Sequence, residues 1–417
     1  MTRLLAMAAL AGTVGFPLAA QLQVPAVPVR VPRVGEVLGD VTGPLDETLG
    51  EAGALTERQA RGLLRLRERA LDRLLGAHPE AIERDSGGNL ARRGALLATG
   101  VAEAELAALE AAGFRVLARE RIEGLDIAFA RLVVPAGMPL AEAQARAAAL
   151  APEAEVEADT LHLAAGGALP SRALPLAATA QAATAAAEVQ VGVIDGGVGA
   201  GVPVLAQKGF AAGAPHPSDH GSAVASLVHA HGAPRLLVAD VYGRDPAGGN
   251  ASALAGALGW LTARGCRVVT ISLVGPRSAL VARAVAAAQA KGVVVVAAVG
   301  NDGPAAPPAY PASYAGVLAI TGVDRKGRAL IEAGRALHLD YAAPGAEVHA
   351  PDARGRTRAW RGTSFAAPLA AARVAAALGG GAAWRARLDA EARDLGPKGA
   401  DAAFGRGLLC GGCGQRK

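Results

Sequence analysis

Short apolar runs that alternate with helical stretches dominate the second half of the chain. The runs are nearly continuous in Val, Leu and Ile, and they lie at residues 189–194, 236–241, 268–274, 293–299 and 317–323. Helical periodicity appears between and after them, at residues 252–264, 278–291 and 364–378. Strands that are apolar on both sides and alternate with helices are typical of a parallel sheet covered on both faces. The pattern predicts a doubly wound α/β domain, which we place at residues 188–409.

The pattern before residue 164 predicts a smaller α+β domain. Strand candidates lie at residues 94–99, 114–122, 127–135 and 156–163, and helix candidates at 102–112 and 139–150. The resulting order, β-α-β-β-α-β, is that of a ferredoxin-like domain at residues 90–163. Such a fold does not assign a function by itself. One more helix is predicted at residues 56–77, where leucines recur with helical spacing.

The remaining segments are assigned from their composition. Residues 1–20 begin with a basic residue, continue with an apolar run too short for a bilayer, and end in small residues, as a signal peptide does. Residues 21–89 combine a Pro/Val-rich stretch with the helix, and residues 164–187 form an Ala/Gly-rich linker. No other stretch reaches the roughly 18 apolar residues of a membrane span. We therefore expect a secreted or periplasmic protein without a membrane span.

Composition and charge exclude several classes of function. Apolar residues make up 52% of the 417 residues and charged ones 19%, which excludes a disordered chain. Aromatic residues make up only 3%, and no clustered basic stripe is present, so no nucleic-acid partner is expected. Residues 1–169 contain 17 Lys and Arg against 22 Asp and Glu, while the rest contains 25 against 15. We interpret these opposite signs as two halves that bind each other.

The three cysteines do not form a disulfide scaffold or a predicted metal site. Cys266 precedes an apolar run and is expected to be a small buried side chain. Cys410 and Cys413 begin the tail at residues 410–417, where two ligands are too few for structural zinc and a local disulfide or a solvated tail is favoured.

Histidines near residue 220 also raise the question of a metal site. On a helix that begins near His220, His229 points to the opposite side and His231 lies about 16 Å further along. One ion cannot bridge such positions, so we expect no metal ligands there.

Four polar side chains lie at strand ends or helix starts, where α/β domains carry their functional groups. Asp195 follows the first apolar run, His220 begins a helix, Asn301 follows another run in a Gly loop, and Ser364 opens a helix. Each has an ordinary structural interpretation as a turn residue or a helix cap. Together they supply a carboxylate, an imidazole, an amide donor and a hydroxyl. A serine hydroxyl needs a base to accept its proton, and that base needs a carboxylate to orient it.

With these residues in place, the sequence resembles the subtilisin-like serine proteases, or subtilases. Their catalytic residues follow the order Asp, His, Ser. The stretches that carry the resemblance are VGVIDGG, HGSAVAS, ISLVGP, AAVGNDGP, YPASYAGVLAITGVD, YAAPGAEV and RGTSFAAP, which together cover roughly residues 189–378.

The resemblance implies a role for each matching residue. Asp195 would orient His220, His220 would act as general base and then acid, and Ser364 would be the nucleophile. Asn301 would contribute to the oxyanion hole, and Ser272, Leu273, Val274 and Gly300 would contact the substrate. The activity implied is that of a serine endopeptidase that hydrolyses protein or peptide substrates through an acyl-enzyme.

The resemblance also implies a zymogen. Many subtilases carry a ferredoxin-like propeptide that assists folding and then inhibits the enzyme, and residues 90–163 fit that pattern. The chain's own N-terminal domain is therefore an expected partner. No cofactor is expected, and calcium binding is raised only by the family resemblance, because no Asp-rich loop is present.

Two departures from the family pattern motivate an alternative. Gly196 stands where the family usually has a hydroxyl residue after the catalytic Asp, and Val274 stands where a strand beside the substrate usually has Gly. The alternative is a catalytically weak or inactive binding protein on a subtilase fold. A dinucleotide-binding protein fits less well, because the glycine run at 196–201 lacks the required spacing. An α/β-hydrolase fits less well, because no G-x-S-x-G is present.

Overall fold

The computed structural model describes residues 57–165, 167–168 and 188–413. The expected signal peptide, most of the expected linker and the last four residues of the tail lie outside the described residues, as do residues 21–56.

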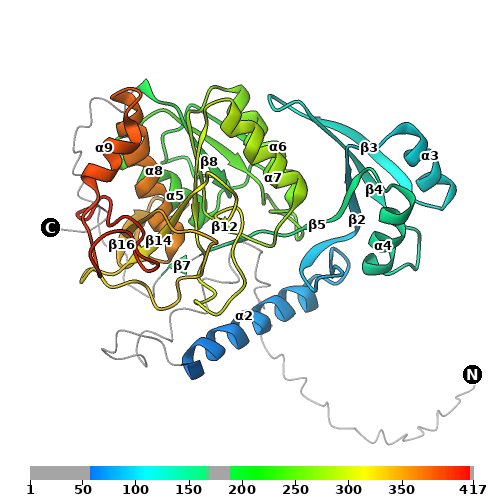
Figure 1. Cartoon of the computed structure of the whole chain (residues 1–417), viewed down its shortest axis with the longest axis horizontal. Coiled ribbons are helices and arrows are strands. Elements are labelled where there is room, and N and C mark those ends of the chain that lie inside the picture. The colour runs from blue at the N-terminus through cyan, green and yellow to red at the C-terminus, as the bar shows by residue number, and fades with distance from the viewer. Residues whose placement is uncertain (1–56, 166, 169–187, 414–417) are drawn as a thin grey trace, which may run out of the picture. The chain divides into compact units, whose positions relative to one another are not determined.

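A seven-stranded parallel sheet forms the centre of the larger domain (Figure 1). Its strand order is β15-β14-β13-β11-β8-β10-β9. The strands are β8 (Val191–Asp195), β9 (Ala206–Gly209), β10 (Leu236–Asp240), β11 (Val268–Ile271), β13 (Val294–Ala298), β14 (Leu318–Val323) and β15 (Tyr341–Pro344). The expected α/β class and parallel sheet are confirmed. The edge strands β9 and β15 were not predicted, because they are short and lack a continuous run of Val, Leu and Ile.

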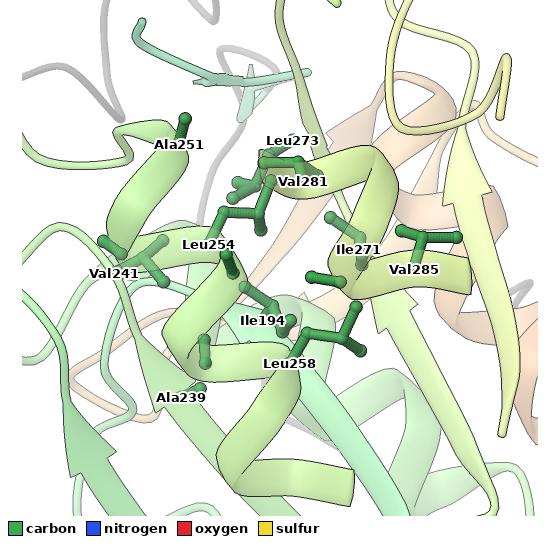
Figure 2. Packing of buried hydrophobic residues seen from close by; sticks show 14 of the residues in the cluster. Ile194, Ala239, Val241, Ala251, Leu254, Leu258, Ile271, Leu273, Val281 and Val285 are labelled. Carbon is green, nitrogen blue, oxygen red and sulfur yellow. The ribbon is translucent and has the colours of Figure 1, made fainter. Parts of the chain in front are cut away.

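Helices of the same domain cover both faces of this sheet. One layer consists of α6 (Ala251–Ala263) and α7 (Ala279–Ala290), and the other of α5 (Asp219–Ala230) and α8 (Thr363–Gly379), with α9 (Trp384–Glu391) packed on α8. Successive strand residues point to opposite faces. Ile194 of β8 therefore packs under α6, as Figure 2 shows, while its neighbour Val193 joins the core beneath α5 and α8.

The smaller domain is an antiparallel sheet with two helices. Its elements are β1 (Ile82–Arg84), β2 (Leu90–Thr99), α3 (Glu103–Ala111), β3 (Arg115–Ile122), β4 (Ile127–Val133), α4 (Leu140–Leu150) and β5 (Glu155–Thr160). From β2 onward this is the β-α-β-β-α-β order that the sequence predicts. Gly113 ends the first of these helices with a φ of +92°, a conformation that favours glycine.

A long helix, α2 (Glu57–Ala77), precedes the smaller domain. Its buried residues Ala70, Leu71 and Leu74 join the apolar core that also contains α6 and α7. The helix that the leucine spacing predicts is therefore present, and its apolar side packs in the molecule's largest core.

The chain after β5 behaves differently from the sequence expectation. We predicted one strand at residues 156–163 and a linker from residue 164. Instead β6 (Leu163–Ala164) pairs antiparallel with β12 (Leu273–Val274), and β7 (Gly167–Ala168) pairs antiparallel with β17 (Thr357–Arg361). β17 also pairs with β16 (Val348–Pro351). The first residues of the expected linker thus form strands with the larger domain, because backbone pairing needs no apolar pattern.

Among the residues that the structure describes, none of the helices combines the length and the apolar character needed to cross a bilayer.

Candidate active site

Asp195 and His220 form a buried pair at the carboxyl end of the sheet. Asp195 is the last residue of β8, and His220 lies in the first turn of α5. Nδ1 of His220 lies 2.9 Å from Oδ1 and 3.0 Å from Oδ2 of Asp195. A carboxylate in this position fixes the ring so that Nε2 is the nitrogen left to accept a proton. This Nε2 is buried and has no hydrogen-bond partner among the described residues.

Gly196 leaves room for the serine that caps the histidine helix. The Ser218 side chain accepts a hydrogen bond from the Gly221 N–H and so caps α5. A Cβ on residue 196 would overlap the Ser218 hydroxyl and its Cβ. The Gly196 N–H donates to Oδ1 of Asp195 at 2.7 Å, so the backbone still supports the carboxylate. The departure at residue 196 therefore has a steric cause in Ser218.

Ser364 lies in the first turn of α8 and is fully buried. The helix N-cap is Gly362, whose φ of 134° favours glycine. Ser364 is therefore not the helix cap that its ordinary structural interpretation would make it. Its N–H donates to the Ala165 carbonyl oxygen at 3.1 Å, and its hydroxyl makes a very short contact with the same oxygen. The serine therefore meets the chain's own backbone, while Nε2 of His220 stays unpaired within the described part of the chain.

Asn301 stands beside the first turn of the serine helix. It follows β13, and its Oδ1 accepts a hydrogen bond from the Thr363 N–H at 3.0 Å. The Thr363 hydroxyl donates to the Gly300 carbonyl at 3.1 Å and ties the same two loops together. The Nδ2 group of Asn301 is buried without a partner among the described residues. A buried amide donor left unpaired is costly for stability and is available to a negative charge that develops on a ligand.

Ser272, Leu273 and Val274 lie next to the serine. They form one wall of the cleft, which is the space that residues 162–165 occupy. The Ser272 hydroxyl donates to the Ser364 carbonyl at 2.9 Å. Leu273 pairs with Ala164 and Val274 with Leu163, so the wall binds an extended chain through its backbone. The structure thus places Ser272, Gly300 and Asn301 in contact with the first turn of α8, and the ring centroid of His220 lies 5.2 Å from that of Phe365, the residue after Ser364.

Ala165 contacts both Ser272 and Ser364 through its backbone. Its N–H donates to the Ser272 carbonyl at 3.2 Å, and its carbonyl oxygen faces the Ser364 N–H and hydroxyl. The sequence analysis missed this residue, because an alanine in an alanine-rich stretch carries no chemical signal.

The segment that contains Tyr242 and Gly249 contacts His162. The His162 N–H donates to the Gly249 carbonyl at 2.8 Å, and the Tyr242 hydroxyl donates to the His162 carbonyl at 2.9 Å. Burial lowers the pKa of the His162 imidazole to about 4, so the ring is neutral at pH 7. Burial, together with the nearby Asp195 and Asp240 carboxylates, raises the pKa of Tyr242, which keeps its hydroxyl as a donor.

Two carboxylates of β5 cap helices of the larger domain. Glu157 accepts hydrogen bonds from the Ser278 hydroxyl and from the N–H groups of Ala279 and Leu280, at 2.7 to 3.0 Å. Asp159 accepts from the N–H and the hydroxyl of Ser252, each at 2.9 Å. Burial raises the pKa of both carboxyl groups. The acidic side chains thus meet the positive ends of α7 and α6, which stabilises contact between the two domains.

The cysteines lie away from this site. Cys410 and Cys413 form a disulfide, and their sulfurs lie within 4.8 Å of a ring nitrogen of His231. Cys266 is buried, and burial raises the pKa of its thiol to about 12, which fits the expected small buried side chain.

Comparisons with known proteins identify the family. The family model described as "Subtilase family" matches residues 186–407. Subtilisin DY from Bacillus licheniformis is 32% identical over 248 residues, which are 54% of this chain and 89% of that protein. A subtilisin from Bacillus pumilus is 29% identical over 246 residues, which are 53% and 88% of the two chains.

A solved structure gives the same fold assignment. Fervidolysin from Fervidobacterium pennivorans, described as a keratinolytic enzyme related to subtilisin, aligns with a TM-score of 0.64 and 19% identity. The alignment covers 79% of this chain, which spans about three fifths (61%) of the fervidolysin chain. With more than half of its residues matched by one family model, this chain belongs to the subtilase family of serine endopeptidases.

Proposed function

We propose that Asp195, His220 and Ser364 are the catalytic triad of this peptidase, and that the chain is made as an exported zymogen. The observation that carries the proposal is the position of the Ala165 carbonyl, which faces the N–H and the hydroxyl of Ser364. A peptide carbonyl in contact with a serine hydroxyl, beside a carboxylate-oriented histidine, is the arrangement that acyl transfer requires.

The first half of the reaction transfers the acyl group to Ser364. The Ser364 hydroxyl turns from the carbonyl oxygen to Nε2 of His220, which takes its proton as Oγ attacks the carbonyl carbon. The negative charge that forms on the carbonyl oxygen is stabilised by the Ser364 N–H and by Nδ2 of Asn301. His220 then gives its proton to the leaving amine as the C–N bond breaks, which leaves an acyl-enzyme.

The second half of the reaction repeats these steps with water. His220 takes a proton from the water, the water oxygen attacks the ester carbonyl, and the proton returns to Oγ of Ser364 as the free acid leaves. Asp195 stays ionised throughout and stabilises the histidinium that forms in each half.

The smaller domain acts as the inhibitory pro-domain in this proposal. It reaches the larger domain through the Glu157 and Asp159 caps, and its C-terminal strand runs through the cleft. Because Ala165 fills the place of a substrate, other peptides cannot bind until the chain is cut and the pro-domain has left. The proposed signal peptide at residues 1–20 would direct the zymogen out of the cytoplasm.

The test compares the intact mass and N-terminal sequence of purified wild type with those of Ser364→Ala. We expect cleavage of the wild type only, with a new N-terminus after residue 165. Ser313→Ala is the matched control, since it removes a buried hydroxyl that donates to the Ala309 carbonyl and accepts from the Leu337 N–H, and neither partner is a proposed site residue. Cleavage of Ser364→Ala to the same extent would reject the assigned nucleophile. If neither protein is cut and a serine-directed phosphonate does not label Ser364, the fold serves binding rather than catalysis.

A further inference from the structure

The register of β6 on β12 determines which side chains lie on the same face of the cleft. Leu163 lies opposite Val274, and Ala164 lies opposite Leu273. The hydrogen bond from the Ala165 N–H to the Ser272 carbonyl continues this register by one residue. Side chains alternate between the two faces of a strand, so those of Ala165 and Leu163 share the face of Val274. Val274 is therefore the diagonal neighbour of Ala165, at a separation that a long or aromatic side chain at position 165 would span.

The Val274 side chain lies on the face that a larger side chain at position 165 would share, and it packs against the Gly300 loop. Its methyl groups lie 3.3 and 3.5 Å from the point where a Cβ on Gly300 would stand. Gly300 immediately precedes Asn301, so Val274 closes the gap between the substrate-binding strand and the loop that carries the amide donor. Both Val274 and Ala165 are buried.

We propose that this cleft accepts only a small side chain, such as that of alanine, on the acyl side of the cut, and that Val274 is the residue that enforces the selection. The inference rests on the proposed function, because it concerns the substrate of the same site. The substrate class is extended, apolar peptide with alanine at the cut. Its first example is the chain's own bond between Ala165 and Gly166.

The physical basis is steric. A phenylalanine at the acyl position would have to displace Val274 or move the strand away from the Ser364 hydroxyl. A displaced carbonyl loses its position relative to the N–H groups that stabilise the transition state. In an apolar pocket, one methylene more or less changes the rate by roughly 10–200-fold.

The first experiment measures self-cleavage in the full chain. We expect Ala165→Phe to slow cleavage after residue 165 by about 100-fold relative to wild type, as followed by intact mass over time. Val274→Gly in the Ala165→Phe chain is expected to restore at least about a tenfold faster cut. Val274→Thr keeps the branched shape and is the matched control, which should not restore it.

The second experiment tests the same selection on separate peptides, and it holds even if Ala165→Phe folds poorly. Self-processed wild type is given peptides of sequence His-Leu-Ala-Xaa attached to a chromogenic amide, with Xaa as Ala, Leu or Phe. We expect the Phe-to-Ala ratio of kcat/KM to rise by at least about tenfold in the Val274→Gly variant.

The outcomes separate this inference from the proposed function. If the wild type cuts itself through Ser364 but cleaves Phe and Ala peptides equally, the inference about Val274 is wrong and the proposed function stands. If Ala165→Phe shifts the cut to a neighbouring alanine, the selection for small residues is supported. An uncut wild type whose Ser364 cannot be labelled contradicts the proposed function itself.

Discussion

The two sheets of this molecule are buried in different ways. The seven-stranded sheet is covered on both faces by helices of its own domain, with α6 and α7 on one side and α5 and α8 on the other. The five-stranded sheet is covered by its own α3 and α4 on one face only. Its other face, with Leu97, Ile122 and Phe129, belongs to the core that contains α6 and α7.

Two consecutive leucines of β2 show what this difference means. Leu96 lies in the core of the smaller domain, while Leu97 lies in the core shared with the larger one, and both are fully buried. A strand with two apolar faces needs a partner on each side. We infer that the smaller domain completes its fold by binding the larger one, while the larger domain has its own complete core.

Substitution of the two leucines tests this comparison most strongly. Each change to Ala removes a fully buried side chain and should lower the free energy of unfolding of the smaller domain by about 2–5 kcal/mol. In the uncut Ser364→Ala chain, we expect Leu97→Ala also to speed hydrogen exchange in α6 and α7, whereas Leu96→Ala should not. Equal exchange patterns in the two variants would show that the faces do not differ in this way.

The leucine substitutions change the docking of the smaller domain. Substitution of Asn301 should instead change turnover and leave this docking intact. Asn301→Ala removes the unpaired Nδ2 donor and should lower turnover by about 10²–10³-fold, the range measured for such a donor in subtilisin, a relative of this chain. The readouts are kcat on a peptide substrate and hydrogen exchange of α6. Gln289→Ala, which removes an amide donor to the Ala315 carbonyl in the larger domain, is the control that should leave turnover unchanged. Unchanged turnover in Asn301→Ala would show that Asn301 does not stabilise the oxyanion.

A glycine of α6 tests the close approach between the domains. A Cβ on Gly259 would overlap Cγ2 of Ile122 and stand 2.5 Å from the Glu123 carbonyl oxygen. Gly259→Ala should weaken docking by about 1–3 kcal/mol, seen as faster proteolysis of the smaller domain in the uncut chain.

The matched control for this prediction is on the same helix. A Cβ on Gly256 would meet only the Phe210 ring, at 3.4 Å, so Gly256→Ala should leave docking nearly unchanged. Similar proteolysis of the two variants would indicate that the domains do not approach each other closely at Gly259.

The smallest expected effect is on the pH dependence of docking after the chain is cut. The pKa of His162 falls from 6.5 to about 4 in the docked state. The contribution of His162 to the free energy of docking is therefore complete above pH 6.5 and is lost as the pH falls toward 4. Burial raises the pKa of Glu157 and Asp159, so their contributions have the opposite sign and oppose part of the loss.

The measurement is retention of the cut N-terminal fragment on the larger domain by size exclusion. Between pH 6.5 and about 4, wild type should release more fragment than His162→Leu, whose side chain does not titrate. Equal release by the two proteins would show that His162 does not control docking.

Most of the fold could be predicted from the sequence where the apolar pattern was strong. The strands β8, β10, β11, β13 and β14 each coincide with a run of Val, Leu and Ile, and the helices beside them follow their predicted ranges to within two residues. Short strands such as β6 and β7 could not be predicted. They form because a partner strand offers backbone hydrogen-bonding groups, and this pairing does not depend on residue type.

The chemistry of the site could also be recognised from residue type and order. Asp195, His220, Asn301 and Ser364 could each serve as a turn residue or a helix cap, so only their combination and order indicated the reaction class. Ser218, Tyr242 and Ala165 could not be found in this way. Their importance depends on which atoms they face, and residue type does not contain that information.

The sequence by itself therefore determined the family and the parallel sheet, because apolar periodicity and sequence motifs are local properties. The tertiary structure alone decided that the Ala165 carbonyl faces Ser364, that Leu163 pairs with Val274, and that one face of the smaller sheet is completed by the larger domain. These are contacts between segments about one hundred or more residues apart in the chain. Their energies depend on shape and on backbone hydrogen bonds that form only after the chain has folded.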